Sequence, residues 1–470
     1  MRSRGDDDAR IVTPARGAAC YSRGVRRTGV VLAGLVISSC RPSASDESGE
    51  SEAAADGATR GGASEGGSSS GGEEVPPPMI DCGAPDFPSG TALRRRPYLQ
   101  SIEGTSARVA WTTTLGGEGV VRWAPSKDGP WTEVTAEAAL FETTYTDDSE
   151  DYFAYDATLT GLSPGAAYCY EVVEDGQVIA GGLSFFTAWD DPARAVRILA
   201  FGDSGDFSPE QLGLRDQMLG HEFDVFLHLG DMAYGSGTFP EFEERVFGVY
   251  EDLLHRVPTY PAPGNHEYKT DRGQPYLDVY YLWEQARRDE DQERYYSFDY
   301  GDVHFVSLDS NGETLLPAAL DIDDENPDDM LDWLEADLAA SDKPWKVAFF
   351  HHPPYTSSER DPNYTVRMGL LPILEDGGVD LVLCGHDHHY ERTKAIRDGQ
   401  ETLHDDGGVY YFVVGSGGAG LRAATGDWWT EAVDDRNHAF LDLTIAGCTA
   451  RGQAVGIDGQ VIDEFELEGC

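Results

Sequence analysis

Five short polar blocks in a fixed order constrain the fold of this chain most strongly. Four of them directly follow a run of apolar residues, at 196–201, 224–229, 345–350 and 379–384. Apolar runs of this length are typical of strands buried on both faces of a sheet. Because α/β sheets place their sites at the carboxyl ends of strands, we expect the blocks to meet at one edge. The blocks are 202–205 (GDSG), 230–234 (GDMAY), 264–267 (GNHE), 351–355 (HHPPY) and 385–388 (GHDH).

The side chains in these blocks predict a site for two metal ions. Together they offer two Asp, one Tyr, one Asn and several His, which are oxygen and nitrogen ligands. Two neighbouring cations repel each other, so they need a shared anionic ligand, and a carboxylate can bridge them. Two metals about 3.5–4 Å apart can clamp both the attacking and the leaving oxygen of a phosphoryl transfer.

The order, spacing and flanking residues of the blocks resemble the purple acid phosphatases, within the calcineurin-like metallophosphoesterases, over about 96–467. The resemblance implies an α/β fold, a two-sheet sandwich. It implies an enzyme that hydrolyses small phosphate monoesters, with a metal-bound hydroxide as the nucleophile. It also implies that the enzyme works outside the cytoplasm. The implied cofactor is a dinuclear centre of Fe(III) with Fe(II), Zn(II) or Mn(II), and the phenolate of Tyr234 favours Fe(III).

The resemblance also assigns roles to single residues. Asp231 would bridge the metals and take part in catalysis. Asn265 and His266 would contact the substrate, and His266 would act on the leaving-group oxygen. The ligands of the first metal would be Asp203, Asp231, Tyr234 and His388, and those of the second Asp231, Asn265, His351 and His386.

The sequence departs from the family pattern shortly after His351. Family members usually carry one or two further His there, whereas this chain has 357–361 (SSERD). Arg360 can bind phosphate through its fork of donors, but Glu359 would repel an anion. A phosphodiesterase or nucleotidase with the same metals therefore stays open. An inactive surface-binding protein is a remote alternative, against which the complete ligand set argues.

Other histidines and one glycine-rich loop have plainer interpretations. His304 alternates within an apolar run, which favours a structural strand histidine. His228, His389 and His404 are also read as structural, whereas His352 is either a support of the site or a residue of its rim. The segment 415–420 (GSGGAG) lacks the Lys-Ser/Thr of a phosphate-binding loop and is expected to be a tight loop at the cleft.

The N-terminus predicts export. Residues 1–39 are expected to be a signal peptide of the lipoprotein type, with Arg26-Arg27 before a short apolar run at 30–37. The segment 37–40 (ISSC) resembles the lipobox of bacterial lipoproteins. The run is too short for the roughly 20 residues of a spanning helix. Lipid on Cys40 would attach the protein to a membrane surface, at the outer membrane or cell surface of a bacterium; a periplasmic or secreted protein is the alternative. Residues 40–78, rich in Ser, Gly and Glu, are expected to be a disordered tether.

Two domains are expected after the tether. Residues 79–190 have an all-β pattern, and 156–165 (DATLTGLSPG) with 168–172 (YCYEV) resembles fibronectin type III domains, which larger purple acid phosphatases carry. Residues 193–470 would form the catalytic domain, with helices at 240–255 and 327–340 and a hairpin near 295–306.

Charge and cysteines limit the partners and the crosslinks. The net charge is −49, and the sequence has no basic stripe, which argues against nucleic acid as a partner. Cys384 ends an apolar strand and is expected to be a buried free thiol. Four other cysteines allow three pairings, of which sequence proximity favours Cys82–Cys169 with Cys448–Cys470.

Overall fold

The structure is a computed structural model, and it describes residues 80–286, 291–312, 315, 330–360 and 362–469. The expected signal peptide and tether, including Cys40, lie outside the described residues, as does Cys470. Among the helices of the described residues, none combines the length and the apolar character needed to cross a membrane.

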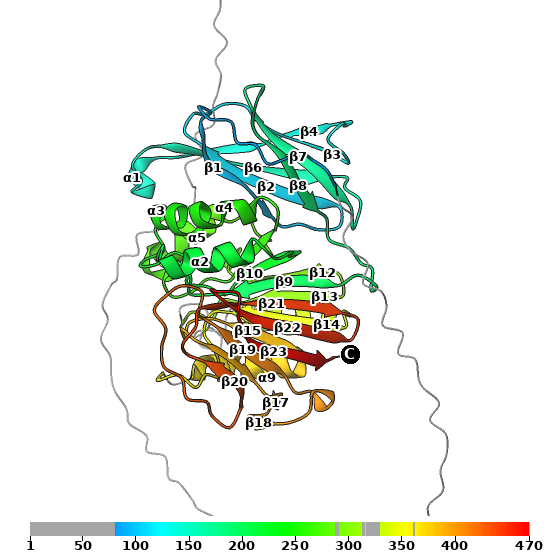
Figure 1. The fold of residues 1–470 in the computed structure, drawn as a ribbon, viewed down its shortest axis with the longest axis vertical. Coiled ribbons are helices and arrows are strands. Elements are labelled where there is room, and N and C mark those ends of the chain that lie inside the picture. Colours follow the sequence, from blue (N-terminus) through cyan, green and yellow to red (C-terminus); the bar gives the residue numbers. More distant parts are fainter. Residues whose placement is uncertain (1–79, 287–290, 313–314, 316–329, 361, 470) are drawn as a thin grey trace, which may run out of the picture. The chain divides into compact units, whose positions relative to one another are not determined.

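The first domain is a sandwich of two antiparallel four-stranded sheets (Figure 1). Its core contains Trp111, stacked on Tyr155 with ring centroids 5.1 Å apart. The disulfide Cys82–Cys169 ties the start of the domain to one of its strands, as sequence proximity predicted. One sheet has the order β1 (Leu93–Gln100), β2 (Ser106–Thr113), β6 (Tyr152–Thr160), β5 (Glu137–Phe141); the other has β4 (Thr132–Thr135), β3 (Gly119–Ala124), β7 (Ala167–Glu174), β8 (Gln177–Phe186).

The second domain contains two larger mixed sheets (Figure 1). The α/β two-sheet fold class is therefore confirmed. The six-stranded sheet has the order β11 (Thr259–Pro261), β10 (Val225–His228), β9 (Val196–Phe201), β21 (Ala439–Ala446), β22 (Thr449–Gly456), β23 (Val461–Glu468). The seven-stranded sheet has the order β12 (Tyr296–Tyr300), β13 (Val303–Ser307), β14 (Trp345–Phe350), β15 (Leu381–Cys384), β19 (Tyr410–Val414), β16 (Tyr390–Thr393), β20 (Thr430–Asp434).

The centre of the seven-stranded sheet is buried on both faces. Along β14, Val347 and Phe349 belong to the core that also contains the six-stranded sheet. Their neighbours Ala348 and Phe350 belong to a second core, which also contains apolar residues of the helices at 330–340, 364–369 and 371–376. Successive side chains of a strand point to opposite faces, so both faces need apolar residues. This explains the continuous apolar run at 345–350.

Helices and turns connect the strands. Ser208 caps α2 (Pro209–Met218) by accepting a hydrogen bond from the N–H of Gln211, and Thr238 forms a capping box with Glu241 at the start of α3 (Phe239–Phe242). The helical segments are α1 (Thr143–Thr146), α2 (Pro209–Met218), α3 (Phe239–Phe242), the π-helical η1 (Glu243–Phe247), α4 (Gly248–Leu254), η2 (Glu267–Lys269), η3 (Asp271–Gly273), α5 (Gln274–Val279), α7 (Met330–Ala340), α8 (Tyr364–Gly369), α9 (Leu371–Asp376) and η5 (His404–Asp406). A small hairpin joins β17 (Ile396–Arg397) to β18 (Gln400–Glu401).

Candidate metal centre

Parallel strands of both sheets bring the predicted ligands together. β9 and β10 are neighbours in one sheet, and β14 and β15 are neighbours in the other. Each of these strands ends just before one of the polar blocks. The backbone has a positive φ at Asp203 (59°), Asp231 (53°) and His386 (70°), a conformation that is uncommon for residues other than glycine. Strained backbone of this kind is typical of functional sites.

Two glycines are needed because backbones meet at this edge. A Cβ atom on Gly264 would overlap the backbone nitrogen of Asp231. A Cβ atom on Gly385 would crowd the carboxylate of Asp203. A glycine beside each ligand therefore lets two loops approach closely enough to share a small site.

Three of the predicted ligands form a first group. The hydroxyl of Tyr234 donates to Oδ1 of Asp203 at 2.9 Å and lies 3.1 Å from Nε2 of His388. Nε2 of His388 lies 3.3 Å from the same carboxylate oxygen. Burial raises the pKa of Tyr234 strongly, and the carboxylates of Asp203 and Asp231 add to this. The phenol therefore keeps its proton here, and a bound cation would have to displace it.

Four predicted ligands form a second group around His351. Nε2 of His351 lies 3.3 Å from Oδ2 of Asp231 and 3.3 Å from Oδ1 of Asn265. Nδ1 of His386 lies 3.2 Å from the same nitrogen. The backbone N–H of His386 donates to Asp203 Oδ2 at 2.6 Å, which links this group to the first. Ligand atoms of Asp203, Asp231 and His351 all lie within 4.8 Å of one another.

The ring orientations of two histidines suit metal ligation. Nδ1 of His351 lies 2.9 Å from the carbonyl of Leu229, and Nδ1 of His388 lies 2.8 Å from that of Gly420. A carbonyl only accepts hydrogen bonds, so each Nδ1 carries the proton and each Nε2 faces the cluster. This second hydrogen bond is the usual support of a metal-binding histidine.

The donor set fits a cation. Oδ2 of Asp231, Oδ1 of Asn265 and Nε2 of His351 are acceptor atoms that face one another. Burial lowers the pKa of His351, but the Asp231 carboxylate outweighs it and raises the pKa to about 9. Burial raises the pKa of Asp231, but His351 and then His266 outweigh it and lower the pKa far below its usual value. A proton on His351 thus stabilises the close approach of its Nε2 to Oδ2 of Asp231, and a bound metal ion would replace that proton.

His266 and Arg360 lie beside the two groups. The backbone N–H of His266 donates to Oδ1 of Asp231 at 2.7 Å, and its ring centroid lies 4.1 Å from that of Tyr234. Burial, with Lys269 adding to it, lowers the pKa of His266. Arg360 is exposed, and its Nη1 lies 2.6 Å from Nε2 of His386. The structure therefore places both predicted substrate contacts at the edge of the cluster.

Sequence reasoning gave no role to three residues that meet the cluster. Glu267 is fully buried beneath it, and burial and then Asp231 raise its pKa to about 7. The ammonium of Lys269 lies 2.9 Å from the imidazole nitrogens of His266. Ser310 Oγ lies 2.9 Å from Nδ1 of His352, the histidine whose position the sequence left open. Of the three, Glu267 alone had a signal in the sequence, as a carboxylate two residues after the predicted ligand Asn265.

The structure gives contacts for the histidines outside the predicted ligand set and for the glycine-rich loop 415–420. His304 lies between two carboxylates, and His228 Nε2 lies 2.8 Å from Ser204 Oγ. His352 and His386 have ring centroids 4.5 Å apart, so His352 belongs to the immediate surroundings of the cluster. In the glycine-rich loop, the N–H of Ala419 donates to the carbonyl of Asp203 at 2.8 Å. That loop therefore supports the first group of ligands.

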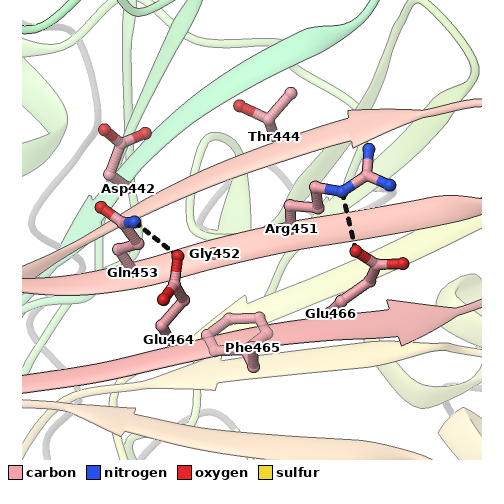
Figure 2. Close-up of a pocket in the computed structure, with 8 residues that line it drawn as sticks. All are labelled: Asp442, Thr444, Arg451, Gly452, Gln453, Glu464, Phe465 and Glu466. Atoms are coloured by element: carbon pink, nitrogen blue, oxygen red, sulfur yellow. Dashed lines mark hydrogen bonds and ion pairs between the residues drawn. The ribbon is translucent and has the colours of Figure 1, made fainter.

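A hollow of about 460 Å³ lies elsewhere, on the face of the strands β21, β22 and β23 (Figure 2). Four of its polar side chains pair with one another: Arg451 with Glu466 at 2.9 Å, and Gln453 with Glu464 at 3.0 Å. It contains none of the predicted ligands. The cluster of predicted ligands is therefore the candidate functional site.

Two family models match the described domains. The calcineurin-like phosphoesterase model matches residues 196–390, and the model of the N-terminal domain of purple acid phosphatases matches residues 95–190. The first spans every predicted ligand, and the second spans most of the β-sandwich.

Curated relatives include purple acid phosphatase 21 of Arabidopsis thaliana, 30% identical over 47% of this chain and 50% of the relative. Acid phosphatase type 7 of Mus musculus is 28% identical over 66% of this chain and 72% of the relative. The chain thus spans about half the length of the plant protein and more of the mouse one.

Solved structures extend the likeness in fold. The purple acid phosphatase PPD1 from yellow lupin (Lupinus luteus) seeds has a TM-score of 0.67 at 21% identity, covering 79% of this chain and 74% of that one. The structure of PhoD has a TM-score of 0.59 at 12% identity, covering 82% and 90%. These likenesses support the two-sheet fold with its preceding β-domain.

Proposed function

Because this chain is a calcineurin-like phosphoesterase that carries the N-terminal domain of purple acid phosphatases, we propose that it hydrolyses phosphate monoesters with a dinuclear metal centre. One observation carries the proposal: seven oxygen and nitrogen ligands from five separate blocks converge, with acceptor atoms facing one another. Acceptors crowded in this way favour a bound cation.

Each group of ligands would hold one metal ion. Asp203, Tyr234 and His388 would hold the first, and Asn265, His351 and His386 the second, with Asp231 shared. The phenol and the carboxylates favour Fe(III) at the first position, and the two imidazoles suit Fe(II), Zn(II) or Mn(II) at the second. When bound, the pair supplies charge neutralisation and a water of lowered pKa, the nucleophile in this proposal.

Residues at the edge of the cluster would act on the substrate. Asn265 would contribute its amide to the phosphate as well as its oxygen to the metal. His266, beside Tyr234 and Asp231, would donate a hydrogen bond or a proton to the leaving-group oxygen. Arg360 would turn its guanidinium from His386 to the phosphate, because a guanidinium donates and does not accept.

Hydrolysis of p-nitrophenyl phosphate and of bis(p-nitrophenyl) phosphate by the purified full chain, loaded with iron and zinc, tests the proposal. We expect a higher kcat/KM for the monoester, and loss of activity in Asp231→Asn. A higher kcat/KM for the diester would favour the phosphodiesterase alternative with the same metals. Hydrolysis that persists unchanged in Asp231→Asn would reject the metal centre as the catalyst.

We also propose that the protein is exported and held by lipid on Cys40. The lipobox-like segment 37–40 and the following Ser- and Gly-rich stretch support this. Together they would hold the enzyme on a flexible arm at an outer membrane or cell surface. Fractionation of cells that produce Cys40→Ser is the test: we expect the variant to leave the membrane fraction, and its retention there would exclude lipid on Cys40 as the sole anchor.

A further inference from the structure

Glu267 connects two ligand-bearing loops through four backbone hydrogen bonds. Its Oε2 accepts the N–H groups of Asp231 at 2.9 Å and Gly264 at 2.8 Å. Its Oε1 accepts those of Met232 at 3.0 Å and Ala233 at 3.1 Å. The side chain is fully buried. One carboxylate thus satisfies four N–H groups, each of which would be costly to bury without a partner.

The loops that Glu267 joins come from separate blocks. The loop after β10 carries Asp231 and Tyr234, and the loop after β11 carries Asn265. Both loops have an unfavourable local geometry. Asp231 has a positive φ, and Gly264 lies against the backbone of Asp231. Without a shared acceptor, the N–H groups of the two loops would face one another with nothing between them.

We propose that Glu267 is a positioning residue that sets the spacing of Asp231 and Asn265 for the second metal ion. It acts through the backbone of both loops and touches neither the substrate nor the metal. The inference rests on the proposed metal centre and adds to it the residue that holds two of its ligands in register.

The chemistry of four donors requires a carboxylate. Glutamine has nearly the same shape, but only one of its terminal atoms accepts. Its NH₂ group would face two N–H donors, either those of Asp231 and Gly264 or those of Met232 and Ala233. Glu267→Gln therefore breaks one pair of bonds with little change in volume.

Zinc titration of the full chain, after removal of metals with a chelator, measures the effect directly. We expect wild type to bind two Zn²⁺ ions, and Glu267→Gln to bind one of them about 10- to 100-fold more weakly, as is usual when the support of a ligand is lost. The first group should be less affected, because two of its three ligands, Asp203 and His388, lie on loops that Glu267 does not join, and Tyr234 alone lies on a loop that it does.

Glu375→Gln is the matched control. Glu375 is also buried and accepts a backbone N–H, that of Asp398 at 3.0 Å, but it lies at the end of α9, away from the ligands. Glu375→Gln should lower the free energy of unfolding measured in urea and leave the affinities for both Zn²⁺ ions unchanged. This separates loss of a buried carboxylate from loss of ligand spacing.

The outcomes distinguish this inference from the proposed function. A folded Glu267→Gln whose two zinc affinities lie within twofold of wild type overturns the positioning role. Should that variant fail to fold, Glu267→Asp decides, because it moves the carboxylate back by about 1.5 Å: a weakening of at least fivefold supports the role, and unchanged affinity overturns it. Absence of zinc binding in wild type overturns the metal centre itself.

Discussion

Raising the pH should weaken the fold through His304. The imidazole lies between two carboxylates, with Nδ1 2.7 Å from Asp299 Oδ1 and Nε2 2.9 Å from Asp337 Oδ2. Its side chain is 7% exposed, so it is shielded from water. Burial lowers the pKa of His304, but hydrogen bonds to Asp299 and Asp337 outweigh this and raise the pKa to about 9.

The size and direction of the effect follow from this pKa. A pKa that rises from 6.5 to about 9 corresponds to about 3 kcal/mol, at about 1.4 kcal/mol for each tenfold change in proton affinity. Asp299 is 53% exposed, and screening by water reduces the figure to about 2 kcal/mol. Because the folded state binds the proton more tightly, this stabilisation is complete below pH 6.5 and disappears as the pH rises through about 9.

Urea unfolding of wild type and His304→Gln, at pH 6 and at pH 9.5, isolates the contribution. Other groups titrate over this range in both proteins, so their effects cancel in the difference between them. We expect the free energy of unfolding to differ by about 2 kcal/mol more at pH 6 than at pH 9.5. A difference that does not change with pH would refute a charged His304 between the two carboxylates.

Three substitutions at the metal centre test separate roles. Tyr234→Phe should remove the visible absorption of the iron-loaded protein while the circular dichroism stays the same; an unchanged visible spectrum would exclude Tyr234 as an iron ligand. His266→Ala should lower kcat by about 10²- to 10⁴-fold with its metal content retained, the loss typical of a proton donor, whereas equal losses of metal and kcat would assign it a structural role. Arg360→Gln should lower kcat/KM for a monoester by about 10- to 100-fold, since a hydrogen bond to a charged group contributes about 1.5–3 kcal/mol. Arg436→Gln, at an arginine whose side chain is 88% exposed, is the control, and equal kinetics in both variants would end the phosphate role of Arg360.

The sequence predicted the central strands well because burial on both faces leaves a local signal. The runs at 196–201 and 345–350 coincide with β9 and β14, and the hairpin near 295–306 is formed by β12 and β13. The division into two sheets had no such signal. It depends on pairings between distant segments, such as that of β21 with β9.

The helices show where a periodic pattern is too coarse. The single helix expected at 240–255 is a series of three segments with a π-helical stretch at Glu243–Phe247. In α7, helical spacing puts Met330, Leu331, Leu334 and Leu338 on one face; the first, third and fourth are buried, whereas Leu331 is only partly buried. Periodicity gives the side of a helix that faces the core but not the depth of each residue.

The candidate site could be located from the blocks, but its supports could not. Residue type and order predicted which side chains would meet, because few side chains can bind metals. The four bonds of Glu267 depend on the meeting of two loops that are more than 30 residues apart. Cys384 is buried and unpaired as predicted, and the Cys448–Cys470 pairing stays a prediction, because Cys470 lies outside the described residues.

The β-sandwich forms buried hydrogen bonds with the second domain. The amide of Gln100, on β1, is fully buried: its Nε2 donates to the carbonyl of Thr259 at 3.0 Å, and its Oε1 accepts the N–H of Tyr281 at 2.7 Å. Thr259 begins β11, the strand that leads to Asn265. The hydroxyl of Tyr98 donates to the carbonyl of Val279 at 2.7 Å. A domain whose buried polar groups bond to the strand before Asn265, a predicted metal ligand, has a structural role in the site and is not a separate module.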